Sequence, residues 1–463
     1  MERRKVIPYI PDRVDEGYGL NIEALNKIKL EMGADLVISV DCGIRSVAEV
    51  AHAREIGLDM IVTDHHSLGR ELPPALAVIN PKRPNSAYPE TMLAGVGIAY
   101  KLAQALHYEM ASYEGFSTQN LLDLVAIGTV ADVAPLLGEN RKLVVEGLEV
   151  LNTLQRPGVS ALAHVAGVRA GMITAETIGF ALGPRINAAG RLDHAYSAAK
   201  LLATDNLLQA TQFANQLNEL NRKRQAITSE LTQHAELLLE NRDDYLLFAA
   251  DDKFLPGVVG LVASRLKENY YRPTIVVEMG ETESHGSCRS IDEFHITDAL
   301  DQVGHLLLRH GGHAQAAGFA IANTNLPAFS AAMKAIAAQQ LAGQELVPSI
   351  TIDAEVAVED VDWALYETFQ QLEPTGAANP TPVLVARQVE VINARAVGKD
   401  SNHLQIELAA GGTRSIKGIG FQQGAWVNCL PSHVDVVYTI SINEWNGRRM
   451  LQLNIQDINP SGS

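Results

Sequence analysis

The chain has 463 residues, of which 47% are hydrophobic and 20% charged, and its formal net charge is −17. A chain of this length exceeds one hydrophobic core, so we expect about two to four domains. The cysteines Cys42, Cys288 and Cys429 form no Cys-x-x-Cys pair, which excludes a disulfide framework and a thiolate zinc site and favours a reducing cytoplasm. No apolar run approaches the ~20 residues of a membrane-spanning helix, and no signal core follows Met1, so we expect no membrane association. The acidic balance excludes a general nucleic-acid coat protein, but it is compatible with an enzyme whose basic groups are confined to one groove.

The first residues predict the start of an α/β unit. Lys5–Ile10 is typical of a strand, Pro11–Gly19 of a loop, and Asn21–Met32 of an amphipathic helix. A parallel sheet that starts in this way lacks a strand before it.

Two neighbouring apolar runs then end in polar side chains. Leu36–Val40 is followed by Asp41-Cys42-Gly43, and Met60–Thr63 is followed by Asp64-His65-His66. The intervening segment Ile44–Ile56 has helical composition, so the pattern predicts strand, crossover helix and parallel strand. Both polar groups then lie at the carboxyl edge of the sheet, where ligands bind in open α/β folds.

The chemistry of these side chains indicates a metal. Carboxylate oxygens and imidazole nitrogens without thiolates suit Mg²⁺ or Mn²⁺ better than Zn²⁺ or Fe²⁺. In the alternative interpretation, Asp64 only caps the next helix and His65 and His66 are surface residues.

The next stretch adds a third acid. Residues 78–92 are expected to be a loop, and a helix is expected from Leu93 to about Leu106. Its Gly95-x-Gly97 start superficially resembles a dinucleotide loop, but no strand precedes it and a tyrosine occupies the third glycine position. Leu121–Val130 predicts a buried helix, and Asp132 follows it directly. The helix dipole disfavours an acid at that end, which favours a functional role over a plain terminal polar residue.

A basic segment and a long helix follow. Gly183–Leu192 is interpreted as a glycine-rich loop whose Arg185 and Arg191 either hold phosphate or form structural ion pairs. Ala195–Arg242 contains no proline or glycine and predicts a long connecting helix, interrupted near Thr204-Asp205. Its Arg222–Arg224 cluster faces a nucleic-acid groove or, alternatively, solvent.

Residues 243–342 predict a second α/β unit. Tyr245–Ala250 and Thr274–Glu278 are expected strands, with a helix at Val258–Glu268 between them. Gly286–Ser290 and Gly311–Gly318 are interpreted as loops in which glycine lets the backbone approach an anion, with amides at a helix start assisting. Three side chains there supply further donors for phosphate, namely Arg289, Ser290 and His313.

After an expected linker at residues 343–349, the remaining chain is rich in short alternating strands. These predict a small barrel of the OB type with one helix. The expected strands are Ile350–Ala354, Val383–Ala386, Leu404–Leu408, Val434–Ile440 and Met450–Ile455.

With these segments in view, the sequence resembles the RecJ single-strand-specific 5′→3′ exonucleases of the DHH phosphoesterase superfamily. The matching blocks occur in family order along nearly the whole chain. They are Val-Asp41-Cys-Gly, Thr-Asp64-His65-His66, Gly128-Thr-Val-Ala-Asp132, Gly183-Pro-Arg-Ile-Asn-Ala-Ala-Gly-Arg191, Gly286-Ser-Cys-Arg289-Ser290 and Gly311-Gly-His313.

The resemblance implies an α/β fold class with four parts. These are an N-terminally incomplete parallel-sheet DHH domain at residues 1–194, a long linking helix at 195–242, an α/β DHHA1 domain at 243–342, and a C-terminal OB-like β-barrel at 349–460. It also implies single-stranded DNA as substrate, repair and recombination as context, and a cytoplasmic monomer that works with a single-strand-binding protein and a helicase.

The same resemblance implies roles for the site residues. Two Mn²⁺ or Mg²⁺ ions act together, with Asp41 bridging both while His65 and Asp132 ligate one of them. Asp64 and His66 orient ligands or touch phosphate. The phosphate at the DNA end is held by four further side chains, namely Arg289, Ser290, His313 and, nearby, Arg191.

Two departures from the family pattern matter. Phe254 and Leu255 occupy the positions of a Trp-His pair, so a contact made by that histidine is absent. The family's first motif, Asp-x-Asp-x-Asp-Gly, is expected upstream of Val6 and does not occur, unless Asp12 or Asp15 replaces it. We therefore expect an incomplete second metal site and low nuclease activity from residues 1–463.

Two other functions compete with this interpretation. One is a DHH phosphodiesterase for short oligonucleotides or cyclic dinucleotides, although an OB-like region and an extended groove are unnecessary for small substrates. The other is a catalytically impaired DNA-binding scaffold, which the missing motif favours and the intact Asp41, His65 and Asp132 oppose.

Overall fold

The computed structural model describes residues 6–11, 19–110, 116–192, 194–445 and 447–462. The residues fall into two compact units, one formed by 1–132 and 146–348 and the other by 133–145 and 349–463. Lys5, Asp12 and Asp15 lie outside the described residues. In the part of the chain that is described, no helix has the length and apolarity to cross a membrane.

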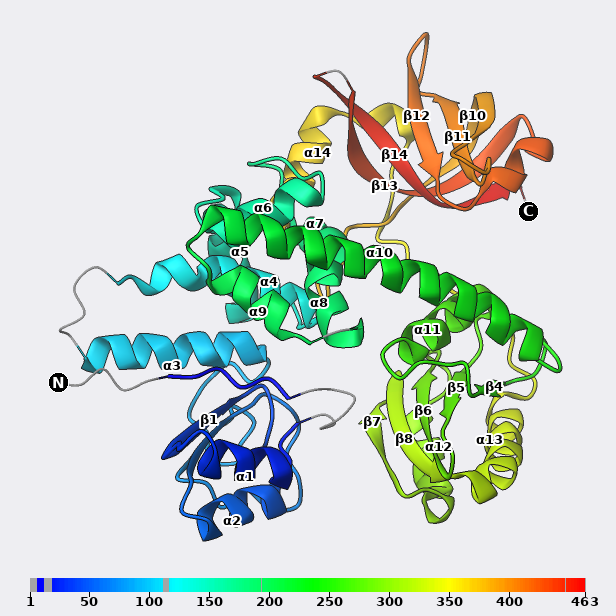
Figure 1. The fold of residues 1–463 in the computed structure, drawn as a ribbon. Helices are drawn as coiled ribbons and strands as arrows, with labels where there is room; N and C mark the ends of the chain where they lie inside the picture. Colours follow the sequence, from blue (N-terminus) through cyan, green and yellow to red (C-terminus); the bar gives the residue numbers. More distant parts are fainter. Residues whose placement is uncertain (1–5, 12–18, 111–115, 193, 446, 463) are drawn as a thin grey trace. The chain divides into compact units, whose positions relative to one another are not determined.

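The first unit begins with a three-stranded parallel sheet. Strands β1 (Leu36–Val40), β2 (Asp59–Thr63) and β3 (Ala77–Ile79) lie in that order, with Val40 opposite Thr63. Helices α1 (Ile22–Leu30) and α2 (Val47–Glu55) lie on one side of the sheet in Figure 1 and α3 (Gly95–Glu109) on the other. The pairing brings the ends of β1 and β2 together, as the sequence predicts.

Two expectations at this sheet were wrong. Residues 6–10, which are expected to be a strand, have neither helical nor strand structure. The expected loop at 78–92 starts later, since Val78 and Ile79 belong to β3 and pair with β2.

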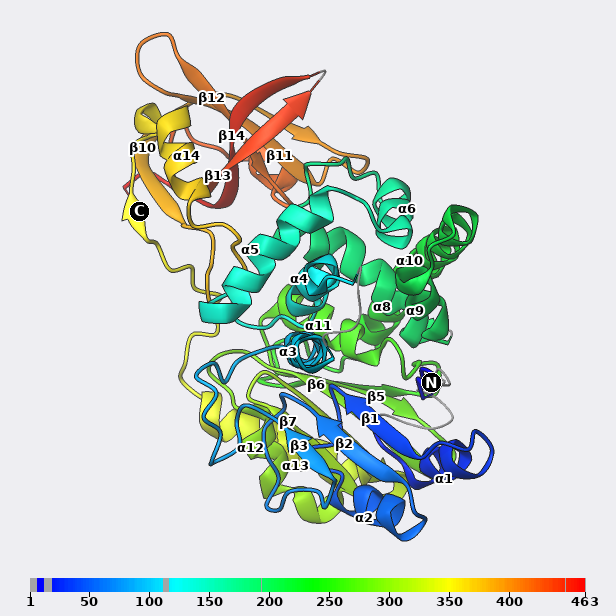
Figure 2. The same cartoon turned by 90° about the vertical axis from the view of Figure 1, so that its left-hand side faces the viewer.

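A helical region follows the sheet (Figure 2). It contains α4 (Leu122–Ala131), α6 (Pro157–Val165), α8 (Gly183–Leu192), α9 (Tyr196–Ala203) and α10 (Leu207–Leu238). The short helices η1 (Thr118–Leu121), α7 (Ala175–Thr177) and η2 (Ile178–Leu182) also belong to it, and α5 (Gly138–Asn152) links the two units.

The predicted long helix is divided. Thr204 has an extended backbone, and the side chain of Asn206 caps the new helix by accepting hydrogen bonds from the amides of Leu208 and Gln209. Because asparagine competes with the helical backbone and satisfies the first free amides, it ends one helix and begins another.

Gly183–Leu192 is a helix rather than the expected loop. Pro184 lies in its first turn, where a missing N–H costs nothing, so the glycine and proline do not break it. Gly183 also lies in a close approach, since an added Cβ would meet Ile178 O at 3.0 Å.

A second sheet has strand order β4-β5-β6-β8-β7. Only β4 and β5 are parallel, and α11 (Val259–Tyr270), α12 (Ile296–Gln302) and α13 (Leu326–Leu341) accompany the sheet. Its strands are β4 (Leu247–Asp251), β5 (Thr274–Met279), β6 (Glu283–Arg289), β7 (Arg309–His313) and β8 (Ala316–Ala322).

The two glycine-rich segments of this sheet are not the expected loops. Residues 283–289 are strand β6, and residues 309–322 form the β7–β8 hairpin, so neither segment offers amides at a helix start. Gly286 is needed for packing, because a Cβ there would lie 2.1 Å from the ring of Phe319.

The second unit is a closed five-stranded barrel with a short added strand. Strands β11-β12-β14-β13-β10 pair in that order and β10 pairs back to β11. The expected strand Ile350–Ala354 shrinks to β9 (Ala354–Glu355), and β12 was not predicted. The elements are α14 (Trp363–Gln370), β10 (Leu384–Val397), β11 (His403–Ala409), β12 (Ser415–Gly420), β13 (His433–Trp445) and β14 (Arg448–Pro460).

A carboxylate braces a bulge in this barrel. Asp435 Oδ1 accepts hydrogen bonds from the amide of Gln388 at 2.9 Å and from the hydroxyl of Ser461 at 3.0 Å, and Oδ2 pairs with Arg387. Gln388 has a φ of +53° where the β10–β13 register shifts. The amide of Gln388 is the main cause that lowers the pKa of Asp435.

Candidate metal centre at the sheet edge

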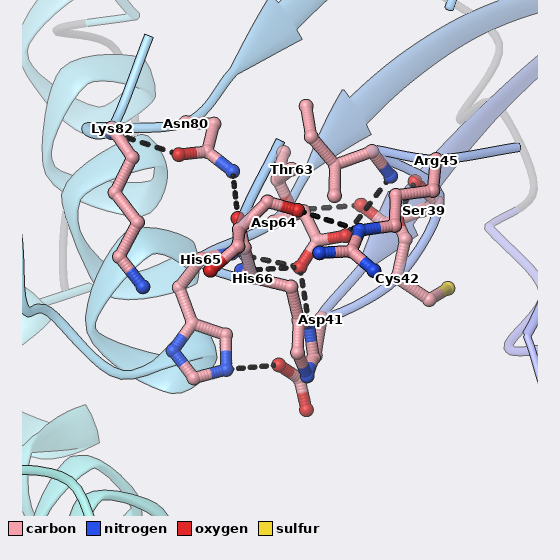
Figure 3. Close-up of polar contacts among 12 residues, drawn as sticks. Ser39, Asp41, Cys42, Arg45, Thr63, Asp64, His65, His66, Asn80 and Lys82 are labelled. Atoms are coloured by element: carbon pink, nitrogen blue, oxygen red, sulfur yellow. Dashed lines mark hydrogen bonds and ion pairs between the residues drawn. The ribbon is translucent and has the colours of Figure 1, made fainter. Parts of the chain in front are cut away.

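Asp41 follows β1 with a left-handed backbone. Its φ is +64°, which is unfavourable for a residue with a side chain, although aspartate tolerates it better than most. Its amide donates to Thr63 O at 2.9 Å and so extends the pairing with β2 by one residue. The turn places the carboxylate at the edge of the sheet beside the residues that follow β2 (Figure 3).

Asp64 organises the loop after β2. Its side chain is 2% exposed, and its Oδ2 accepts from the amide of Ile44 at 3.0 Å. Oδ1 accepts from the amides of His65 and His66 and lies 2.7 Å from Nδ1 of His66. Burial alone would raise the pKa of Asp64, but these hydrogen bonds outweigh it and the pKa is lowered. The alternative of a plain helix cap does not describe this carboxylate.

The two imidazoles and two more acids converge. His65 Nε2 lies 3.0 Å from Asp41 Oδ1 and 3.5 Å from Asp132 Oδ2. One ligand atom from each of Asp41, His65 and His66 lies within 4.8 Å of the others. The hydrogen bond of His66 to Asp64 uses Nδ1 and leaves Nε2 facing this group, an arrangement common for metal-bound histidine. From the sequence, His66 is expected to orient ligands or to touch phosphate, and not to bind the metal itself. The Asp64-x-His66 spacing, which allows the aspartate to orient the imidazole, is the sequence feature that could have indicated a ligand.

Asp132 enters from the end of α4. It caps the helix with an αR backbone, and its amide bonds to Gly128 O. Burial and the Asp41 carboxylate raise its pKa, while the His65 ring opposes the shift. Gly128 lets α4 approach α3, since a Cβ there would lie 2.7 Å from Val96.

The donor set fits a divalent cation. Asp41 Oδ1 and His65 Nε2 are shielded from solvent and, within the described structure, have no hydrogen-bond partner of acceptable geometry. Buried polar atoms without partners are rare, and a shared cation satisfies both. The Asp41 carboxylate raises the pKa of His65. Burial raises the pKa of Cys42 to about 11, and its thiol is not among the grouped ligand atoms of Asp41, His65 and His66.

Two further residues at this site were missed from the sequence. Gly95 begins α3, and a Cβ there would lie 2.4 Å from Asp41 Oδ1, so the glycine exists for contact with the acid and not for a dinucleotide. Lys82 extends beside His65 (Figure 3), and its charge lowers the pKa of both His65 and Asp132. No local pattern marks Lys82, and the Gly95-x-Gly97 pattern resembles a dinucleotide loop and gives no indication of the contact with Asp41.

The expected phosphate-binding residues of the second sheet differ in availability. Arg289 bonds to the hydroxyls of Ser264 and Ser287 and lies against Gly260 at the start of α11. Ser290 is 2% exposed and its hydroxyl donates to Phe294 O, so it is committed to the fold. The side chain of His313 is exposed.

The two arginines of α8 form hydrogen bonds to other segments of the protein. Arg185 Nε donates to the side chain of Asn218 and Nη1 to Ala181 O. Arg191 Nη1 donates to Gly257 O at 3.0 Å, just before α11. Phe254 is 1% exposed and packs in the core between α10 and α11, so the aromatic residue at this departure from the family pattern is structural.

Comparisons with known proteins agree on one family. Its DHH family N-terminal domain matches residues 1–129, its DHHA1 domain residues 243–339, and its RecJ OB domain residues 352–457. Together with the observed sheets, these matches confirm the expected fold class.

The chain is 37% identical over 455 residues to the single-stranded-DNA-specific exonuclease RecJ of Bacillus subtilis (strain 168), covering 97% of this chain and 57% of that protein. Its identity to the RecJ of Escherichia coli (strain K12) is 36% over 473 residues, covering 97% and 82%. The crystal structure of RecJ in complex with Mn²⁺ from Thermus thermophilus superposes with a TM-score of 0.82 at 32% identity, covering 95% of this chain and 64% of that one. The chain thus spans little more than half the length of the Bacillus relative.

Proposed function

Because the chain belongs to the RecJ family, whose matched relatives are named single-stranded-DNA-specific exonucleases, we propose that it is a metal-dependent exodeoxyribonuclease. It degrades single-stranded DNA in the 5′→3′ direction during repair and recombination. The observation that carries this proposal is the convergence of Asp41 Oδ1 and His65 Nε2, which lie 3.0 Å apart, are shielded from water, and have no hydrogen bond of acceptable geometry among the described residues.

In the proposed site, Asp41, His65 and Asp132 hold one Mn²⁺ or Mg²⁺, with His66 as a further ligand. A divalent cation held there supplies Lewis-acid chemistry to phosphodiester hydrolysis. Asp64 orients His66 through Nδ1 and fixes the loop by its contact with the amide of Ile44.

For the DNA end we propose Arg289, His313 and Arg191 as the phosphate-facing residues. The Arg289 guanidinium is preoriented by Ser264 and Ser287, which supports a bidentate contact with phosphate. Ser290, whose hydroxyl is occupied by Phe294 O, acts by shaping the turn after β6. Arg185 acts through its hydrogen bonds to the Asn218 side chain and to Ala181 O of η2.

The domain boundaries 1–194, 195–242, 243–342 and 349–460 belong to the same proposal, supported by the element breaks near them. The proposal also includes a barrel that binds single-stranded DNA and a monomeric state. It includes a single-strand-binding protein and a helicase as partners, and all of these expectations rest on the family resemblance. A reducing cytoplasm is supported by three free cysteines.

The test is digestion of a 5′-phosphorylated single-stranded oligonucleotide with Mn²⁺ or Mg²⁺ present or chelated. We expect slow, metal-dependent release of nucleotides from the 5′ end by residues 1–463, and a further loss of at least about 100-fold in Asp41→Asn, because a misplaced or missing ligand has effects of that order. Asp59→Asn, an exposed acid at the opposite end of β2, is the matched control.

Full activity in Asp41→Asn would overturn the assignment of the site. Preference for cyclic dinucleotides or very short oligonucleotides would instead support the phosphodiesterase alternative, and tight binding without digestion would support the scaffold alternative. The matched relatives favour neither alternative.

A further inference from the structure

A pocket of about 190 Å³ opens between α10 and α11. From α10 it is lined by Arg224, Gln225 and Thr228, which repeat at helical spacing on one face. Where two helices pack, such positions usually carry apolar residues. Further along the same pair of helices they do, since Leu231 of α10 packs with Val262 of α11.

The wall contributed by α11 adds a second arginine. It consists of Leu261, Ser264, Arg265 and Glu268, again at helical spacing. Thus two arginines line one small pocket, while the single acidic lining residue, Glu268, is exposed.

Within the part of the chain that is described, no carboxylate pairs with either arginine. Among the described residues, neither Arg224 nor Arg265 forms an ion pair, and Arg224 Nε is shielded from solvent without a hydrogen-bond partner. Burial and then the charge of Arg265 lower the pKa of Arg224. Two like charges held together in a partly buried place are unfavourable unless an anion joins them.

A third guanidinium stands behind the pocket. Ser264 Oγ accepts a hydrogen bond from Arg289 Nε at 3.1 Å and donates to Gly260 O. Ser264 therefore lines the pocket and also contacts the proposed end-phosphate residue Arg289.

From the orphaned Arg224 Nε, the neighbouring Arg265 and the pocket that both line, we propose a second anion site that binds a phosphate group, separate from the site at Arg289. Arginine forks match phosphate oxygens, and a group of this size fits the volume. The phosphate comes either from the backbone of a DNA strand or from a free nucleotide. The site is independent of the proposed hydrolysis, because binding here uses none of the metal-centre residues.

The experiment measures binding of inorganic phosphate to residues 1–463 by calorimetry in a chelating buffer, so that metal and digestion play no part. An Arg289→Met background removes the other proposed phosphate contact. We expect Arg224→Met or Arg265→Met in this background to weaken phosphate binding at least about tenfold, the change for one lost charge-assisted bond. Arg222→Met, an exposed arginine on the same helix that pairs with Glu219, is the control and should change it less than twofold.

A thermal melt separates a ligand site from a structural arginine. Without anion, Arg265→Met should melt at the same temperature as the parent or higher, because the repulsion between two arginines has been removed. Addition of phosphate should raise the melting temperature of the parent more than that of Arg265→Met. A parent that binds no phosphate, or an Arg265→Met protein that melts lower without anion, overturns the proposal.

Two further ligands identify the source. A strand with a 5′-hydroxyl tests the backbone, and thymidine 5′-monophosphate tests the free nucleotide. Weaker binding of the strand in Arg265→Met, with a shallower salt dependence, assigns the pocket to DNA backbone. If only the monophosphate binds more weakly to Arg265→Met, the pocket is assigned to a free nucleotide. If neither the strand nor the monophosphate binds more weakly, the proposal is overturned.

Discussion

Replacing Gly95 by alanine tests whether the start of α3 positions Asp41. An added Cβ would lie 2.4 Å from Asp41 Oδ1, 2.7 Å from its Cγ and 2.9 Å from its Cβ, and real contacts stay above 3.0 Å. Rotation of the carboxylate cannot relieve the last of these, since the Cβ position follows the backbone. The backbone of Asp41 is in turn fixed by its φ of +64° and its bond to Thr63 O. Either the helix or the strand end must shift.

The expected penalty follows from that shift. Overpacking of this kind destabilises by about 1–3 kcal/mol. A metal ligand displaced by a fraction of an ångström should weaken Mn²⁺ binding by about 10- to 100-fold, and a displacement near 1 Å should slow turnover on the order of 100-fold. Calorimetric Mn²⁺ titration and the digestion assay measure both, with the unfolding midpoint as a check on the fold.

Gly179→Ala is the matched control, because a Cβ at that helical glycine meets only Val130 at 4.0 Å. It should leave Mn²⁺ affinity unchanged. If Gly95→Ala binds Mn²⁺ within twofold of the parent, Gly95 does not position Asp41 and the reasoning is wrong.

Three further predictions concern carboxylates that are held by hydrogen bonds. Arg156→Met should destabilise the first unit by about 3–5 kcal/mol in circular-dichroism denaturation, because it strands the Asp123 carboxylate, 6% exposed, that Arg156 binds through two nitrogens. Asp64→Ala should weaken Mn²⁺ binding about 10- to 100-fold, since the His66 ring loses its orienting partner; unchanged affinity would contradict this. Asp435 has a pKa in the folded protein below its ordinary 3.8. Its contribution to stability is therefore fully present above pH 3.8 and is lost as the pH falls through the lower pKa of the folded state. Between about pH 5 and pH 2 the barrel of Asp435→Asn should therefore lose less stability than the parent, which tryptophan fluorescence reports because all three tryptophans lie in residues 349–463.

The sheet edge could be predicted because its signals are local. A β-branched run that ends in Asp41, and another that ends in Asp64-His65-His66, specify two parallel strands whose polar ends meet, and His65 does lie 3.0 Å from Asp41. Asp132 was found in the same way, from a buried helix with an acid at its disfavoured end.

The glycine-rich segments could not be predicted, because their glycines serve distant contacts. Gly286 admits the Phe319 ring from β8, and Gly257 lies against the backbone of Arg191, where a Cβ would come within 2.1 Å of its oxygen. From sequence such glycines are indistinguishable from those of a phosphate loop. Only the pairing partner, 33 residues away for Phe319, shows that residues 283–289 are a strand.

The departures from local rules gather at the metal centre. Asp41 holds a left-handed backbone, α3 carries a glycine in its first turn for steric reasons, and two shielded polar atoms face each other without a hydrogen bond of acceptable geometry among the described residues. Each feature is unfavourable for folding alone, by about 1–3 kcal/mol for a shielded polar atom or a strained residue. A fold retains several such unfavourable features in one place only where they favour the binding of a ligand. A cation that joins Asp41 Oδ1 to His65 Nε2 relieves the unsatisfied atoms and makes use of the strained backbone, so the geometry that is costly to the fold also preorganises the site.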